Sequence, residues 1–182
     1  MSRKRNEDEY TALSIKVESY EVAVGVSVNL NLQTPVPIRY SDDDPVFTPD
    51  LKLEFVGTST YPEQRAGDRY EIVVYGERAE KEQLKLKDIH VRDKHELPVY
   101  RTYRGQEIPV FKPPPGIAVL DKRPGIREWS LWVFVVASVA RDMLTLLTAS
   151  RRPLYLSILE RKIDRQRWVQ SLKLRTTDPA YE

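Results

Sequence analysis

The chain has 182 residues, with 29 Lys and Arg against 27 Asp and Glu, and it contains no cysteine. A chain of this length is expected to fold as one domain that buries about 70% of its unfolded surface without disulfides or a structural metal. The lack of cysteine excludes disulfides, thiolate nucleophiles and zinc or iron–sulfur sites held by cysteine. The N-terminal residues MSRKRNEDEY contain no apolar secretion signal, which predicts a cytoplasmic protein.

Charge is distributed unevenly along the chain. Residues 1–100 carry 14 basic and 19 acidic side chains, a net charge of −5, whereas residues 101–182 carry 15 and 8, a net charge of +7. Salt bridges between the two halves of a folded domain account for such a gradient. The alternatives are an anionic partner or a self-complementary assembly.

Strand patterns dominate the chain, as runs of alternating apolar and polar residues bounded by turn residues. In chain order these runs cover 13–32, 51–57, 68–77, 82–93, 97–111, 116–120, 129–136 and 153–177. The runs at 97–111 and 153–177 each predict a hairpin, turning at Arg104-Gly105-Gln106 and near Asp164-Arg165-Gln166.

The stretch WSLWVFVVASVARDMLTLL, residues 129–147, is the most apolar part of the chain. Its first 12 residues are uncharged, and then Arg141 and Asp142 interrupt it. A membrane-spanning helix needs about 20 apolar residues, so we expect no membrane partner. The first half is apolar on both alternating faces, which predicts a strand buried on two sides at 129–136.

The second half of this stretch changes to a helical period. It predicts a short helix at about 138–149, with Ser138 as its N-cap. One face of this helix carries four apolar residues, Val139, Met143, Leu146 and Leu147. Nine or ten strands and one helix predict a mainly β single domain, built as an antiparallel β-sandwich or a partly open β-barrel.

Three segments lack the strand pattern. The first is residues 1–10, which we expect to form a disordered charged tail. It precedes a single β-rich domain at 11–178, and residues 179–182 form a C-terminal tail. Residues 33–50, rich in proline and aspartate, predict a long surface loop, and the prolines that begin 111–125 predict polyproline II.

The sequence favours a binding protein over an enzyme, with an enzyme of unrecognised type as the third possibility. It contains no G-x-S-x-G, H-E-x-x-H, Walker A or G-x-G-x-x-G motif, and its seven glycines leave little for a phosphate-cradling loop. We predict no cofactor. The segment YPEQRAGDRYEIVVYG, residues 61–76, stands out as motif-like, but the sequence assigns it no role.

Two clusters have the residue types of a metal site. Asp42, Asp43 and Asp44 lack the alternating spacing of an EF-hand, which predicts a solvated acidic turn. His90 and His95 are the only histidines, and residues five apart on one strand point to opposite faces. We therefore expect no metal site, although these two histidines are the only candidates for a histidine general base.

The strongest functional signal is the basic C-terminal run, which has eight basic and two acidic residues between Arg151 and Arg175. Arginine forks bind phosphate, and an adjacent Trp can stack on an unpaired base, which predicts single-stranded nucleic acid as the ligand. The predicted contact residues are Arg151, Arg152, Arg161, Lys162, Arg165, Arg167, Trp168, Tyr103 and Arg104. The alternative is that Trp168 packs in the core and the arginines only solvate the hairpin. An exposed Trp168 would favour nucleic acid, and a buried one a structural role.

A second possibility is a protein-interaction or assembly module. The acidic loop 42–50 and the proline-rich segment 111–116 are candidate docking elements, since a preformed polyproline II segment loses little entropy on binding. A chain divided by charge can also form a homo-oligomer head to tail.

Overall fold

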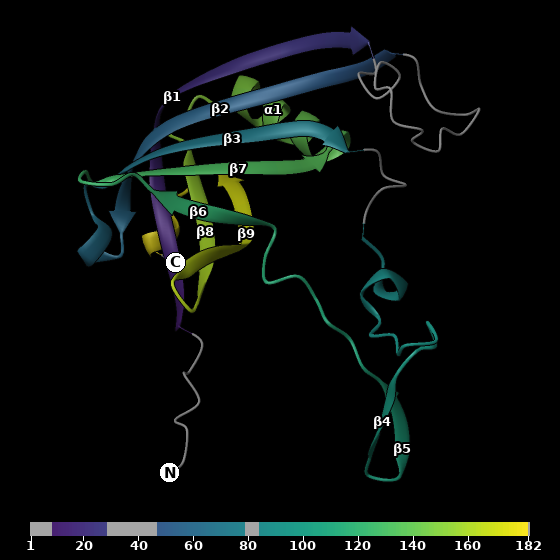
Figure 1. Ribbon diagram of the computed structural model, residues 1–182. Coiled ribbons are helices and arrows are strands. Elements are labelled where there is room, and N and C mark those ends of the chain that lie inside the picture. Colours follow the sequence, from purple (N-terminus) through teal and green to yellow (C-terminus); the bar gives the residue numbers. More distant parts are fainter. Residues whose placement is uncertain (1–8, 29–46, 79–83, 182) are drawn as a thin grey trace.

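Seven strands close into a barrel in the computed structural model, which describes residues 9–28, 47–78 and 84–181 (Figure 1). Around the barrel the order is β1 (Glu9–Val28), β2 (Phe47–Tyr61), β3 (Arg69–Arg78), β7 (Glu128–Val136), β6 (Ala118–Lys122), β9 (Gln166–Arg175) and β8 (Tyr155–Ile163). The predicted mainly β class with one helix is confirmed. The barrel is closed, and it departs from the antiparallel prediction at one pair, because β3 and β7 are parallel.

The parallel pair results from a long excursion of the chain. After β3 the chain leaves the barrel, and residues 84–117 form an arm that lies away from it (Figure 1). This arm contains the hairpin of β4 (Tyr100–Tyr103) and β5 (Gln106–Pro109). The chain returns as β6, and β7 then pairs with β6 on one side and with β3 on the other.

The barrel interior is filled by alternate side chains of all seven strands, as the period of two requires. Its most fully buried apolar members are Leu13, Ile15, Leu53, Phe55, Tyr70, Ile72, Val74, Leu131, Val133, Leu156, Ile158 and Val169. Glu160 of β8 points inward among them and is fully buried. A buried carboxylate requires charged partners, so Glu160 marks a polar region inside the barrel.

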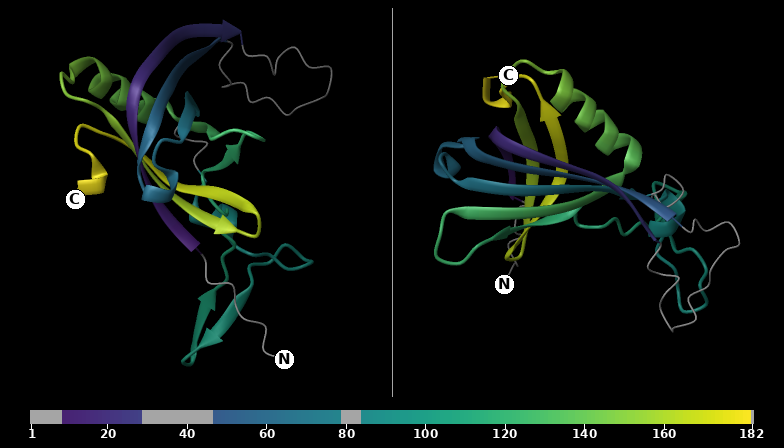
Figure 2. Two further views of the ribbon diagram at one scale, coloured as in Figure 1. Left: turned by 90° about the vertical axis from the view of Figure 1, so that its left-hand side faces the viewer. Right: turned by 90° about the horizontal axis from the view of Figure 1, so that it is seen from above.

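Helix α1 (Ala137–Ala149) packs against β2, β3 and β7 at the end of the barrel where β3 and β7 finish (Figure 2). A Cβ at Gly76 of β3 would lie 2.7 Å from the Cβ of Ala140, so glycine permits this close approach. The predicted helix is confirmed, and Met143 and Leu147 are buried as expected. Val139 is instead exposed, and no side chain caps the helix, because Val136 stands at the N-cap position predicted for Ser138.

The prediction of a strand buried on two sides at 129–136 is wrong. Trp132 is 62% exposed and Phe134 is 43% exposed, both on the outer surface of β7. Tyr75 of β3 stacks on Phe134 with a ring separation of 5.0 Å, so these rings cover one another but no second layer covers them among the described residues. None of the helices in the described ranges has the length and apolarity needed to span a bilayer.

The strand predicted at 82–93 is also wrong where the structure describes it. Residues 84–93 contain a 3-10 turn, η4 (Leu86–Ile89), and two isolated bridges to the rest of the arm. Leu84 and Leu86 are exposed, because the arm provides no sheet on which their predicted apolar face could pack. Of the predicted acidic loop at 42–50, residues 42–46 lie outside the described residues.

Both predicted hairpins are confirmed. The β4–β5 turn places Arg104 and Gly105 at φ values of 51° and 79°, and the β8–β9 turn places Asp164 at 56°. Positive φ at these positions suits the right-handed twist of two-residue hairpins.

Strand β1 changes its partner along its length. Residues Glu9–Lys16 pair with β8, whereas β2 pairs with residues Ser14–Val28. Register shifts near Ile15 and Val17 bend the strand between these halves. At the bend, a Cβ on Gly57 of β2 would lie 2.3 Å from the Lys16 carbonyl oxygen, so the crossing requires glycine.

Candidate anion-binding site

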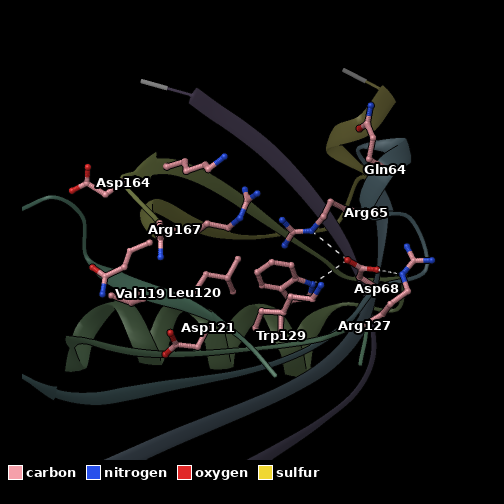
Figure 3. Close-up of a pocket in the computed structure, with 14 residues that line it drawn as sticks. Gln64, Arg65, Asp68, Val119, Leu120, Asp121, Arg127, Trp129, Asp164 and Arg167 are labelled. Atoms are coloured by element: carbon pink, nitrogen blue, oxygen red, sulfur yellow. Dashed lines mark hydrogen bonds and ion pairs between the residues drawn. The ribbon is translucent and has the colours of Figure 1, made fainter. Parts of the chain in front are cut away.

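A cleft of about 930 Å³ lies at the end of the barrel where β3 and β7 begin (Figure 3). Three connections surround it: the β2–β3 connection with its 3-10 turn η2 (Glu63–Arg65), the β6–β7 turn and the β8–β9 turn. Its charged lining residues are Arg65, Lys122, Arg127, Lys162, Arg165, Arg167, Asp68, Asp121 and Asp164. Six cations against three carboxylates give this cleft a net positive charge.

Arg65 and Trp129 form the floor of the cleft. The Arg65 guanidinium carbon lies 3.6 Å from the Trp129 ring centroid, a separation typical of a cation–π contact. Its Nε donates to the Tyr70 hydroxyl at 3.0 Å. Burial raises the pKa of Tyr70 to about 12, although the Arg65 charge opposes this rise. The phenol therefore stays protonated and accepts from Arg65.

Asp68 connects the floor to the rim. Its carboxylate accepts from Trp129 Nε1 at 3.0 Å and from Arg127 Nε at 2.5 Å, and it lies 3.3 Å from Arg65 Nε. Arg127 also donates to the Ala66 carbonyl oxygen at 3.0 Å. Two hydrogen-bond donors and one ion pair on a single buried carboxylate fix the β2–β3 connection to the start of β7.

Glu160 completes the floor from inside the barrel. Its Oε1 forms ion pairs with Arg65, at 3.5 Å, and with Arg167. Its Oε2 has no hydrogen-bond partner among the described residues. Two arginines and two carboxylates, Asp68 and Glu160, make the floor electrically balanced, as buried charges require.

The rim of the cleft carries the excess charge. It consists of four exposed cations, Lys122, Arg127, Lys162 and Arg165, with the carboxylates of Asp121 and Asp164. Lys162 pairs with Glu9 at 3.2 Å, and Arg127 pairs with Asp68. Neither Lys122 nor Arg165 forms an ion pair with another described residue, so both are available to an anion.

The structure brings together three of the predicted contact residues, Lys162, Arg165 and Arg167. Arg161 and Trp168 are cross-strand neighbours on the outer surface instead. The Arg161 guanidinium lies 5.7 Å from the Tyr10 ring centroid. Trp168 pairs with Val119 of β6 and is half-buried. Its exposure therefore does not distinguish a nucleic-acid contact, which an exposed Trp168 would favour, from a structural role, which a buried one would favour.

The remaining predicted residues lie elsewhere. Arg151 and Arg152 are exposed in the connection between α1 and β8, at the opposite end of β8 from the cleft. Tyr103 and Arg104 are exposed on the β4–β5 hairpin, where the Arg104 guanidinium lies 5.2 Å from the Tyr103 ring centroid. The structure therefore does not gather these residues around the cleft.

The predicted contact residues did not include Arg65, Asp68, Trp129 and Glu160 of the floor, nor Lys122 and Arg127 of the rim. The motif-like segment 61–76 contains Arg65, Asp68 and Tyr70, and the spacing of an Arg and an Asp by three residues was the available signal. Nothing in the sequence linked that segment to Trp129.

No group of three or more His, Asp or Glu side chains suited to a metal occurs among the described residues. His90 lies in the arm against the rings of Tyr100 and Phe111, and His95 stands in an exposed turn of the same arm. Fold and site together define a closed β-barrel with a basic cleft at one end. No family model, no curated protein and no solved structure matches this chain.

Proposed function

We propose that this protein binds single-stranded nucleic acid, with the phosphates of the strand held in the basic cleft. The observation that carries this proposal is the convergence on one cleft of six cations from three separate connections and the strand ends beside them. Arginine forks and lysine ammonium groups are the side chains that bind phosphate in proteins. Phosphate contacts supply most of the affinity of sequence-independent binding.

The division of the cleft into floor and rim supports this role. The floor charges neutralise one another and hold the three connections together, so they provide a rigid base. The exposed rim cations can then exchange water and counterions for phosphate without leaving a buried charge unpaired. Lys122 and Arg165 are the strongest candidates for direct phosphate contact.

A single strand suits this site better than a duplex. The cleft is recessed between three turns, and the described residues around it offer neither a helix nor a β-ribbon that projects into a groove. Arg65 already covers one face of Trp129, so this ring is not a free stacking platform. Tyr10 is exposed but lies on the outer surface beside Arg161, whose guanidinium is 5.7 Å from its ring centroid, so it does not provide a free stacking ring in the cleft either. We therefore expect weak base preference.

The test is fluorescence anisotropy of labelled single-stranded DNA and RNA oligonucleotides, titrated at several salt concentrations. In the double variant Lys122→Ala/Arg165→Ala, affinity should fall by roughly tenfold to a hundredfold. The slope of log affinity against log salt should decrease by about 1.4, since each lost phosphate contact on a single strand contributes about 0.7. The matched control, Arg151→Ala/Arg152→Ala, removes the same charge at the other end of the barrel and should bind like the wild type.

Three outcomes would overturn the proposal. One is the absence of binding at low salt. Another is equal loss of affinity in both double variants, which would indicate attraction by net charge alone. The third is equally tight binding of a duplex of the same length, which would exclude the preference for single strands.

A further inference from the structure

The second half of β1 has one edge that no strand of the described residues pairs with. Val17 N donates to the Leu154 carbonyl oxygen at 2.9 Å, and this is where contact with the β8 side ends. From Ser19 to Val28 the strand pairs with β2 on one side, while no described strand pairs with the other side (Figures 1 and 2). Alternate residues of this segment therefore direct their backbone donors and acceptors to an edge that no described strand occupies.

This edge carries an apolar face that no described residue covers. Val24 is 73% exposed and Val26 is 70% exposed, and Tyr20 on the same face is also exposed. Their β2 partners continue the inward-facing row of the barrel, whereas the main contacts of α1 are with β3, β2 and β7. Exposed apolar patches of this kind mark interaction surfaces.

The edge also lacks the usual protection against pairing. Natural edge strands carry charges, prolines or bulges that prevent another strand from adding to them. Glu18 and Glu21 precede the exposed region, but the segment Val22–Val28, VAVGVSV, has no charge and no proline. Its register with β2 is regular from Ser19 to Val28, so no bulge protects it either.

We propose that this edge pairs with the same edge of a second copy of the chain, antiparallel across a two-fold axis. An open backbone edge selects a β-strand as its occupant, because only a strand satisfies its donors and acceptors in series. The same edge in both copies is what a two-fold axis requires. The two β1–β2 ribbons then form one continuous four-stranded antiparallel sheet.

The sequence of the edge suits pairing with itself. In a register centred on Val24, Val22 lies opposite Val26, so the exposed apolar faces of the two copies coincide. Glu21 then lies opposite Ser27, which avoids the opposition of like charges. β-Branched side chains opposite one another are favourable cross-strand pairs. This assembly is independent of the basic cleft, which lies at the other end of the barrel.

Sedimentation equilibrium of the full chain over a range of concentrations tests this pairing. We expect a monomer–dimer equilibrium that Val24→Lys weakens by at least roughly tenfold, because two inward-facing ammonium groups would meet at the two-fold axis. The matched control, Ala23→Lys, adds the same charge to the outer face of the same strand and should dimerise with nearly unchanged affinity. Val24 is exposed in the single chain, so the substitution should leave its thermal unfolding unchanged.

Cross-linking identifies the paired edge directly, because the chain has no cysteine of its own. Val24→Cys should form an intermolecular disulfide under mild oxidation, and Arg151→Cys, on an exposed connection, should not. A chain that stays monomeric at every concentration overturns the proposal and leaves a strand of a different protein as the occupant. A dimer that Val24→Lys does not weaken, or that Val24→Cys does not cross-link, overturns it as well.

Discussion

The guanidinium of Arg65 lies over the indole ring of Trp129, with 3.6 Å between its central carbon and the ring centroid. Arg65 comes from the β2–β3 connection and Trp129 from the start of β7, and Arg65 is almost completely buried between Asp68 and Glu160. This contact joins the segment before β3 to the start of β7, next to the point where those strands begin to pair in parallel. The stability of that end of the barrel therefore depends on Arg65.

We expect Arg65→Ala to lower the free energy of unfolding by about 3–5 kcal/mol, since it leaves two buried carboxylates short of a partner. Urea denaturation followed by circular dichroism measures this change. Arg165→Ala removes an exposed arginine from the same cleft and should cost under about 0.5 kcal/mol. A similar cost for both variants would mean that the floor of the cleft is not a structural element.

The Tyr70 hydroxyl predicts how stability changes at high pH. Its pKa is about 12 in the folded protein, mainly because burial disfavours the phenolate, against an ordinary value of 10.0. Between these values the unfolded chain releases the proton and the folded chain retains it, so stability falls as pH rises from 10 to 12. The loss should amount to about 3 kcal/mol at most. Tyr70→Phe should lose this component, which urea denaturation across the pH range measures.

Local patterns in the sequence were enough to predict most of the strands. The hairpin turns at Arg104-Gly105 and Asp164-Arg165 follow from residues adjacent in the chain, and so does the helix that follows β7. Such elements depend on alternation and turn chemistry, which a single sequence contains. The exposure of Trp132 could not be predicted in this way, because composition does not reveal which face of a strand lacks a covering layer.

The candidate site could be predicted only in part, for a topological reason. Lys162, Arg165 and Arg167 lie on one hairpin, so the basic run in the sequence was enough to predict them as neighbours. Asp68 and Trp129 are 61 residues apart, and they meet only because the chain returns from the 84–117 arm to place β7 parallel to β3. No local signal determines where such a return occurs, since hairpins alone would have made every pair antiparallel.

The crossing of β1 and β2 predicts a large effect from one added methyl group. A Cβ at Gly57 would lie 2.3 Å from the Lys16 carbonyl oxygen and 2.9 Å from Ile15 Cγ2, and both strands are fixed by neighbours there. Gly57→Ala should therefore destabilise the protein by about 2–4 kcal/mol through overpacking, as thermal unfolding will measure. Gly25→Ala is the matched control in the same strand pair. Its Cβ would meet the movable end of the Asp50 side chain, and it should be nearly neutral.

Measurements of stability and binding on the same variants should distinguish the role of the floor of the cleft from that of its rim. Arg167→Gln breaks the ion pair with the fully buried Glu160 and should lower the midpoint of urea unfolding, with a loss of about 2 kcal/mol or more. Arg165→Gln changes an exposed side chain on the same hairpin, so it should leave that midpoint unchanged but weaken oligonucleotide binding by roughly threefold to tenfold. Both substitutions remove one positive charge within two residues of the same turn, so attraction by net charge is equal for the two variants.

If Arg165→Gln binds like the wild type while Arg167→Gln unfolds more readily, the floor is structural and the rim does not contact the strand. If the two variants instead have the same unfolding midpoint, the buried pair with Glu160 does not hold the hairpin in place.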